Sequence, residues 1–468
     1  MSISEAQLAA HFEELFSPDA LFDVFVRRFS SSPAKGCDRI NGYQYEPRAK
    51  LDLQTASTKC LAGTFRFSPY LETLRTKGRD RLPRLISVPT VRDRVVLHQL
   101  KDLLALAFPD SVPKSIASGL VREVAASVAA LQPKKHFACG CDVKDFYGSI
   151  RRERLNALLS KTINESRLLK LVARALVTPT VPPAARRRDH SKYQTAAGVP
   201  QGLAISNILA AVYMSDVDAA MRKLGVTYFR YVDDVLILGK EAAVRRAHKS
   251  FLARARARSL TVHKLNSGKS HISRLDSRFG YLGYLFDWPM VTVRNSTVEN
   301  LLHSIAARFS EFRHNKVRRM ARYAYLTSDR LNEIFLFELN ERITGAISEK
   351  RRYGWVAYFS QITDLSLLHK LDSAVRGMFG RLADFGGVAP QGLKSFARAF
   401  FEMKYRPAGG YVRNFDLIKL PAEKLKYLQE RGKLDPKETL TDAQIERAFV
   451  RYRSKVLAAM QADEGNMY

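Results

Sequence analysis

Two adjacent carboxylates, Asp233 and Asp234, lie inside an otherwise mostly apolar stretch that reads YFRYVDDVLIL over residues 228–238. The apolar and aromatic residues on both sides of the pair predict two strands joined by a tight turn. A turn at the tip of such a hairpin would hold carboxylates at a sheet edge, where they can bind divalent metal ions beside a phosphate. The alternative is an ordinary polar turn, because Asp is common in turns.

A third carboxylate, Asp142, ends the apolar run FACGCD. By itself it would be read as a strand-end or turn residue. Metal-assisted nucleotidyl transfer needs carboxylates from separate segments, because two ions about 3.5–4 Å apart contact the attacking and leaving oxygens. Together with Asp233 and Asp234, Asp142 therefore favours a catalytic site with two Mg²⁺ ions, for which Mn²⁺ can substitute. Asp142 and Asp233 are expected to bind the ions directly, with Asp234 in support.

The charge of the chain indicates a polyanionic partner. Its 468 residues include 76 Lys and Arg against 46 Asp and Glu, which gives a formal charge of +30. Such an excess is typical of proteins that bind nucleic acid. A membrane is the competing polyanion, but no apolar run approaches the roughly 18–20 residues of a spanning helix. The N-terminus also lacks the features of a signal peptide, so a cytoplasmic protein is expected.

The cysteines argue against a zinc module. They are Cys37, Cys60, Cys139 and Cys141, and no two of them form a CxxC pair, so a zinc site is not expected. Cys139 and Cys141 share one face of a predicted strand. We interpret them as buried thiols of a protein in a reducing, intracellular compartment.

Patterning divides the rest of the chain. Residues 1–75 are predicted to be mainly helical, residues 295–384 helical with one basic and one apolar face, and residues 385–420 Gly-rich and irregular. Trp355 and Tyr358 are expected to fill the core of the helical region. A last helix is predicted from about Asp442 to Met460, with Thr441 as its N-cap.

Several segments resemble, in order, the motifs of prokaryotic reverse transcriptases of the group II intron and retron lineage. The similarity extends over roughly residues 60–380. The segments are RLISVPTVRDRVV, CDVKDFYGSI, AAGVPQGLAIS, YVDD, LNSGKSHI, FGYLGYLF and RRYGWVAYFSQITDLSLLHKLD. Several specific motifs in the order of the family make a chance resemblance negligible.

This resemblance implies an α+β right-hand polymerase, with fingers, a palm with an antiparallel catalytic sheet, and a helical thumb. It places an N-terminal helical extension at residues 1–75, fingers and palm at 76–288, the thumb at 289–384 and a C-terminal extension at 385–468. The implied activity is that of an RNA-directed DNA polymerase, which copies an RNA template into cDNA from dNTPs.

The resemblance also assigns roles near the incoming nucleotide. Arg84, together with Arg92 or Arg94, would face nucleotide or template phosphates. Tyr147 would press against the sugar C2′ and exclude a 2′-hydroxyl, unless it is a packed core residue. Gln201, between a proline of fixed φ and a permissive glycine, would contact the nucleotide.

Further roles concern pyrophosphate, metal and primer. Lys269 would neutralise or protonate pyrophosphate, unless it is a solvated loop residue. The Val143 carbonyl would add an oxygen ligand for the metal ions. Tyr281 and Gly283 would hold the primer end by close backbone approach.

Two exposed basic clusters are candidates for phosphate contacts: Arg186, Arg187 and Arg188 in a Pro- and Arg-rich loop, and Arg245 and Arg246 on a basic helix. Solvated faces are the alternative. In a chain of charge +30, binding to nucleic-acid phosphates is the better interpretation.

Alternative functions remain open. An RNA-templated RNA polymerase on the same palm is disfavoured by Tyr147, and an RNA-binding protein with an inactive palm is disfavoured by the intact carboxylates. Residues 385–468 contain no cysteine, unlike the nuclease tails of intron proteins, and NALLS at Asn156–Ser160 lacks the His of a retron motif. The resemblance therefore favours a stand-alone bacterial enzyme of the antiviral defence group that copies a structured non-coding RNA. A group II intron or retron-like enzyme with another role is the second choice.

Overall fold

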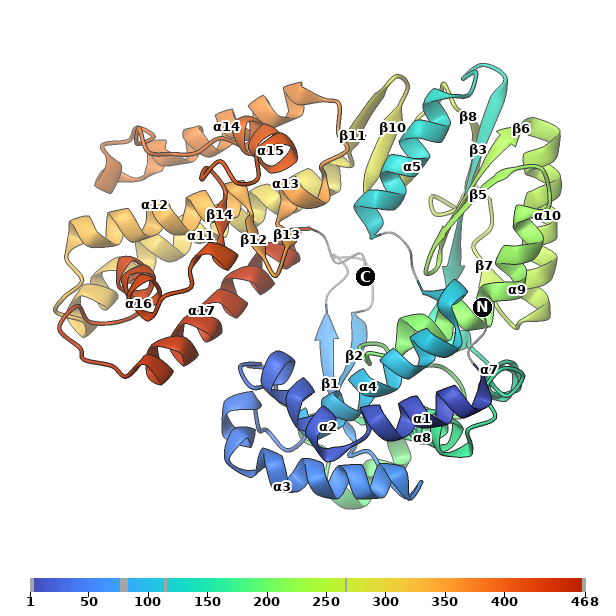
Figure 1. The fold of residues 1–468 in the computed structure, drawn as a ribbon. Helices are drawn as coiled ribbons and strands as arrows, with labels where there is room; N and C mark the ends of the chain where they lie inside the picture. Colours follow the sequence, from blue (N-terminus) through green and yellow to red (C-terminus); the bar gives the residue numbers. More distant parts are fainter. Residues whose placement is uncertain (1–3, 76–82, 113–115, 266, 465–468) are drawn as a thin grey trace. The chain divides into compact units, whose positions relative to one another are not determined.

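The computed structural model describes residues 4–75, 83–112, 116–265 and 267–464 (Figure 1). Two compact units can be distinguished by their internal contacts. Unit 1 contains Met1–Lys114 and Lys135–Arg274, and unit 2 contains Ser115–Lys134 and Leu275–Tyr468. None of the helices within these described ranges is long and apolar enough to cross a membrane.

Unit 1 combines helices with two sheets. Its helices are α1 (Glu5–Leu15), α2 (Pro18–Val24), α3 (Gly42–Leu61), α4 (Val91–Ala107), α6 (Phe146–Ser149), α7 (Arg152–Leu159), α8 (Ser166–Val177), α9 (Ser206–Arg222) and α10 (Glu241–Ala257). Its strands are β1 (Tyr70–Arg75), β2 (Arg84–Val88), β3 (His136–Lys144), β4 (Thr180–Val181), β5 (Thr227–Tyr231), β6 (Asp234–Lys240), β7 (Thr261–Val262) and β8 (His271–Arg274).

The first predicted helix is present as α1. Ser4 caps it, because the Ser4 hydroxyl accepts from the Gln7 N–H while the Gln7 side chain accepts from the Ser4 N–H. Leu8 and Phe12 are buried, and they join the core that continues through the sheet of unit 1. The mainly helical prediction for residues 1–75 holds up to β1.

A five-stranded antiparallel sheet forms the centre of unit 1, with the order β5-β6-β3-β7 and β8 also paired to β3. Its core positions are apolar: Val235, Leu236, Ile237 and Leu238 of β6 are all buried. Helix α10 packs against β3 and β6. A second sheet, with the order β2-β1-β4, contains the predicted fingers strand with Arg84.

Unit 2 is mainly helical. Its helices are α5 (Ala117–Ala129), α11 (Asn295–Arg322), α12 (Ser328–Thr344), α13 (Trp355–Tyr358), α14 (Leu365–Met378), α15 (Phe396–Tyr405), α16 (Pro421–Glu430) and α17 (Asp442–Asp463). Its strands are β9 (Phe279–Tyr281), β10 (Tyr284–Asp287), β11 (Met290–Val293), β12 (Ala346–Ser348), β13 (Arg351–Tyr353) and β14 (Arg413–Asn414). The α+β class predicted from the sequence is confirmed.

Two expectations about unit 2 are wrong. Residues 295–384 are not wholly helical, because β12 and β13 form a hairpin whose turn residues Glu349 and Lys350 have positive φ. Residues 385–420 are not wholly irregular, because α15 is a helix capped by Ser395. The glycines around α15 obscured the apolar spacing of Phe396, Ala399 and Phe400, which are all buried.

The last predicted helix is confirmed as α17, and Thr441 is its N-cap in a capping box with Gln444. Phe449 and Met460 on α17 share a small core with Phe415 and Tyr427. Arg431, at the end of α16, donates to Glu341 of α12 over 2.6 Å, and both side chains are buried. Residues beyond 385 therefore pack with α12 in one unit.

Candidate active site

The predicted strand–turn–strand around the Asp pair is present as β5 and β6. Tyr231 pairs with Asp234, so only Val232 and Asp233 form the turn. Val232 has a φ of 55°, a left-handed conformation that is strained for a β-branched residue. This short turn places Asp233 at its tip and Asp234 at the first position of β6.

Strand β3 brings the third carboxylate to the same place. Its Asp142 lies opposite Asp234 in the antiparallel register of β3 and β6. Burial, and after it the neighbouring charges of Asp234 and Asp142, together raise the pKa of Asp233 to about 6. The structure thus brings together the three carboxylates that were identified from two distant segments.

An ion pair that sequence reasoning missed holds this hairpin. Arg230 on β5 donates to Asp218 on α9 through Nε (2.8 Å) and Nη2 (2.5 Å), and through Nη1 to the carbonyl of Val232 (2.9 Å). Tyr228 also donates to Asp218, over 2.8 Å. Both members of the ion pair are nearly buried, with 11% and 9% of their side chains exposed. Their only sequence signal is a charge within apolar strand and helix patterns.

Tyr147 and Arg84 lie beside the carboxylates. Burial raises the pKa of Tyr147, and the charge of Asp233 contributes to this while Arg84 opposes it. The Tyr147 hydroxyl donates to Asn207 Oδ1 over 2.5 Å. Arg84 acts in the opposite sense on Asp233, whose pKa it lowers. An aromatic ring and a guanidinium therefore accompany the acidic cluster, and their roles at a sugar and a triphosphate stay predictions.

The Pro-Gln-Gly segment packs on the fingers strand β2. The Gln201 carbonyl accepts from the Ser87 N–H over 2.7 Å. Gly202 has a φ of 104°, and a Cβ at this position would meet the Ser87 carbonyl at 2.8 Å. The glycine is therefore required for the close approach of the two segments, which fixes Gln201 relative to β2.

Lys269 reaches the cluster from the loop before β8. Its Nζ lies 2.9 Å from Asp142 Oδ2 and 3.1 Å from His263 Nε2. About a third of the Lys269 side chain is exposed, at 37%. Lys269 is thus an exposed loop residue whose ammonium lies beside a predicted metal ligand, and its role at pyrophosphate stays a prediction.

The donor set fits divalent magnesium. Asp142, Asp233 and Asp234 supply only carboxylate oxygens, which suit a hard cation. Burial is the first cause of the raised pKa of Asp233, and the charges of Asp234 and Asp142 contribute after it. Lys269 places a positive charge beside Asp142. Val143 pairs with Val262 of β7, and the role of its carbonyl stays a prediction.

Arg94 and Arg92 have partners elsewhere in unit 1. Arg94 donates to Ser32 Oγ and to the Ala34 carbonyl, and burial lowers its pKa to about 10. Arg92 donates to its neighbour Asp93 and also to the Arg66 carbonyl and Ser68 Oγ, both over 3.2 Å. These contacts tie α4 to preceding segments, so a nucleotide-binding role for Arg94 stays a prediction.

The other predicted binding residues are placed as follows. Arg186, Arg187 and Arg188, and Arg245 and Arg246 on α10, are all exposed. Tyr281 and Gly283 belong to unit 2, where Leu282 and Gly283 form a two-residue turn between β9 and β10. Tyr281 is 3% exposed, as a core residue would be. Their roles on nucleic acid stay predictions.

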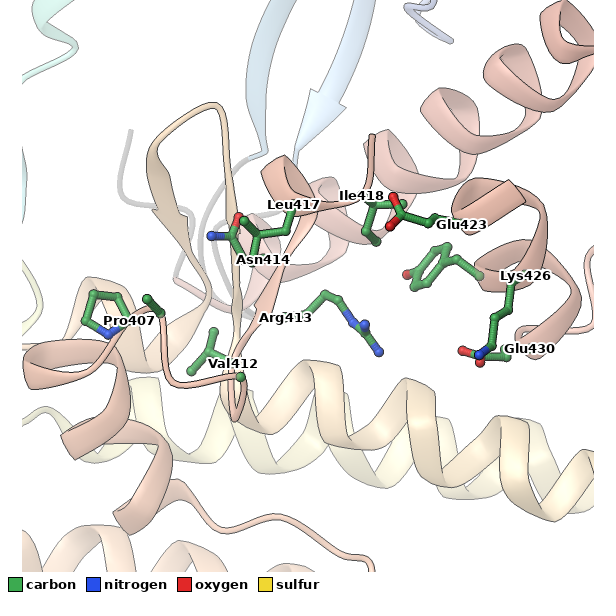
Figure 2. Close-up of a pocket in the computed structure, with 12 residues that line it drawn as sticks. Pro407, Val412, Arg413, Asn414, Leu417, Ile418, Glu423, Lys426 and Glu430 are labelled. Atoms are coloured by element: carbon green, nitrogen blue, oxygen red, sulfur yellow. The ribbon is translucent and has the colours of Figure 1, made fainter. Parts of the chain in front are cut away.

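Two cavities lie among the described residues of unit 2. One, of about 340 Å³, is formed by the segment 407–418 and by α16 (Figure 2). Figure 2 shows Arg413, Glu423 and Lys426 among its lining side chains. The other, of about 500 Å³, is lined by α11, α12 and α17. Neither is lined by the acidic cluster, which is a site on unit 1.

Comparisons with known proteins give one family match. Residues 77–286 match the family model described as reverse transcriptase (RNA-dependent DNA polymerase). No curated protein matches the chain.

Two solved structures show a distant similarity. An apo telomerase from Candida tropicalis, truncated from its C-terminal domain, is 13% identical with a TM-score of 0.37, over 49% of this chain and 55% of that one. The RNA-dependent RNA polymerase of a human picobirnavirus is 14% identical with a TM-score of 0.32, over 46% and 42%. The chain thus spans about half the length of each.

The family match includes every residue of the acidic cluster and its neighbours, from Arg84 to Lys269. It also covers the antiparallel sheet that carries the carboxylates. The predicted right-hand polymerase fold agrees with this match. Residues 77–286 are therefore a reverse transcriptase domain, and the enzyme class that this domain defines is RNA-directed DNA polymerase.

Proposed function

We propose that the whole chain copies an RNA template into cDNA, using the cluster of Asp142, Asp233 and Asp234 as its catalytic site. The observation that carries this proposal is the register of β3 and β6, which brings Asp142 opposite Asp234 beside the turn residue Asp233. This arrangement lies inside the segment that matches the reverse transcriptase model.

Asp142 and Asp233 would hold two Mg²⁺ ions, with Asp234 in support. Bound there, the ions would activate the primer hydroxyl and neutralise charge on the phosphates. Tyr147 excludes a 2′-hydroxyl from the nucleotide sugar, and Gln201 orients the nucleotide. Arg84 stabilises the triphosphate, and Lys269 supplies a positive charge or a proton to the departing pyrophosphate.

The test is incorporation of labelled dNTPs on an RNA template with a DNA primer, with Mg²⁺ or Mn²⁺. The wild-type protein is expected to extend the primer with dNTPs, and Asp233→Asn to lose this activity while keeping its affinity for RNA. Preferential use of rNTPs would identify an RNA-templated RNA polymerase. RNA binding without any incorporation would support a protein with an inactive palm.

The template, in this proposal, is a dedicated structured non-coding RNA. A charge of +30 favours any RNA, but selectivity needs recognition of shape or of unpaired bases. The candidate surfaces are residues 1–75, the Arg186–Arg188 loop and residues 385–468. Sequencing RNA that co-purifies with the protein should give one predominant species, whereas a heterogeneous cellular pool would refute the dedicated template.

The biological role that we propose is antiviral defence in bacteria. Support comes from the resemblance to stand-alone bacterial enzymes and from residues 385–468, which contain none of the four cysteines. Wild-type protein, expressed with its genomic neighbourhood, should lower phage plating, and Asp233→Asn should not. Equal plating on both strains would favour an intron-like or retron-like enzyme with another role.

A further inference from the structure

Two thiols of β3 and an imidazole of α10 lie close together on one face of the central sheet of unit 1. Cys139 and Cys141 alternate with Gly140 and Asp142 along β3, so both sulfurs lie on one face of the sheet. Their Sγ atoms are 3.6 Å apart. His248 comes from α10, which packs against β3, and a ring nitrogen of His248 lies within 4.8 Å of both sulfurs.

His248 lacks a partner for one of its nitrogens. The residue is 7% exposed, and its Nε2 is buried with no hydrogen-bond partner among the residues that the structure describes. A buried polar atom without a partner is costly, and in native proteins it commonly points to an ion or water. The two thiols are also buried, at 0% and 2% exposure.

The donor set and its spacing suit a thiophilic metal ion. Tetrahedral zinc with Zn–S bonds of about 2.3 Å places two sulfurs roughly 3.8 Å apart, close to the spacing found here. Two thiolates would balance the charge of Zn²⁺, which lowers the cost of burial. Thiolate and imidazole also suit Cu(I), whereas Mg²⁺ prefers oxygen ligands.

We propose that Cys139, Cys141 and His248 form a structural site for a thiophilic cation, Zn²⁺ or Cu(I), which is separate from the Mg²⁺ site. The bound ion ties α10 to β3 and so supports the strand that carries Asp142. This proposal differs from the sequence-based expectation that zinc is absent, which stays untested. Cysteines at i and i+2 of a strand can place two thiols on one ion, as a CxxC pair does in a turn. The third ligand, His248, is more than a hundred residues away in the sequence.

Elemental analysis of the purified full-length chain tests the site. We expect about one Zn or Cu ion per chain. After removal by a chelator, adding back Zn²⁺ or Cu(I) alone should restore the content and raise Tm by several degrees. Loading with Co²⁺ should give the near-ultraviolet absorption of thiolate ligation. The ion that is retained and that raises Tm decides between zinc and copper.

Matched variants locate the site. Cys139→Ser with Cys141→Ser should abolish binding, and His248→Phe, which preserves volume, should weaken it by about tenfold or more. Cys60→Ser, at a fully buried cysteine of α3, should bind as the wild type does. Wild-type protein that binds neither ion, or a double serine variant that retains one, would overturn the proposal even if variants fold poorly. None of these measurements depends on polymerase activity.

Discussion

Asp142 of β3 and Asp234 of β6 lie opposite one another in antiparallel register. Asp233, which directly precedes Asp234, lies at the hairpin tip. Each strand alone presents its carboxylates at an edge, and only the pairing of the two strands produces an acidic cluster. Burial and the charges of Asp234 and Asp142 raise the pKa of Asp233 to about 6.

Replacing Asp142 or Asp233 by Asn should lower dNTP incorporation by about a thousandfold or more, because in the proposed mechanism each carboxylate would contribute several kcal/mol through the metal ions that it holds. RNA affinity should be unchanged, since neither residue lies on an exposed basic surface. Glu153→Gln, at an exposed acidic residue of α7, is the charge control. Full activity in either Asn variant would remove these residues from the catalytic site.

Tyr147→Val should raise the ratio of rNTP to dNTP incorporation by about tenfold or more, because it removes the ring that would meet a 2′-hydroxyl. Tyr147→Phe keeps the ring and loses only the bond to Asn207, so its ratio should stay near that of the wild type. Parallel primer extension with each nucleotide set measures both. A uniform loss of both activities together with a lower Tm would indicate a core-packing role instead.

Asp218→Asn should destabilise unit 1 by about 3–5 kcal/mol, because it leaves the nearly buried Arg230 without its countercharge. The Arg230 contact with the Val232 carbonyl links this loss to the hairpin, so incorporation should also fall. Chemical denaturation of Asp218→Asn, of Arg230→Met and of the double variant gives the coupling free energy between the two residues. Additive effects on stability would contradict the ion pair.

Glu464 makes stability depend on pH. Its pKa is raised from 4.5 to about 7, first by burial and then by the charge of Asp463. The folded state therefore holds a proton that the unfolded chain releases, so the stability from Glu464 is present below about pH 4.5 and lost as the pH rises through 7. The difference between the unfolded and folded pKa of Glu464 corresponds to at most about 3 kcal/mol of folding stability.

Glu464→Gln should therefore match the wild type in Tm near pH 4.5 and exceed it near pH 8. The Gln side chain keeps an oxygen that can accept from the Gly354 N–H, as Glu464 does over 2.9 Å. Glu438→Gln, at an exposed position, serves as the control. A Tm difference that is the same at both pH values would show that Glu464 does not titrate in this range.

Alanine at Arg186, Arg187 and Arg188 should reduce the salt dependence of RNA binding. Each phosphate contact that is lost should change the log–log slope by about 0.7 on single-stranded RNA. The three side chains are exposed, so Tm should not change. A variant with Ala at Arg245 and Arg246 allows the same measurement for the basic cluster on α10. A slope equal to that of the wild type would exclude the loop from the RNA interface.

The hairpin of β5 and β6 could be predicted because its signals are local: a strand pattern, a pair of carboxylates and a second strand pattern. The cap of α17 at Thr441 follows from the same kind of local rule. The expectation that Trp355 fills a core also holds, since the residue is 1% exposed, whereas Tyr358 is only partly buried. Such features depend on neighbours within a few residues.

Contacts between distant segments could not be predicted. Asp218 and Arg230 are ordinary helix and strand residues until α9 and β5 are placed together. His248 looks like a helix residue on a basic surface, and only the packing of α10 on β3 turns it toward the two cysteines. Helix α5 gives no sign in its sequence that its contacts group it with residues after 275.

The membership of α5 in unit 2 has a consequence for synthesis on the ribosome. Val121, Val124 and Val128 are buried in the finished protein, but the rest of unit 2 begins only at Leu275. At 5–20 residues per second, α5 emerges roughly 7–30 s before the first of those residues. During that time the nascent chain exposes an apolar helix beside a unit 1 that is still being made. We therefore expect chaperones that bind nascent chains to engage α5, and a chain shortened to residues 1–274 to aggregate through this helix.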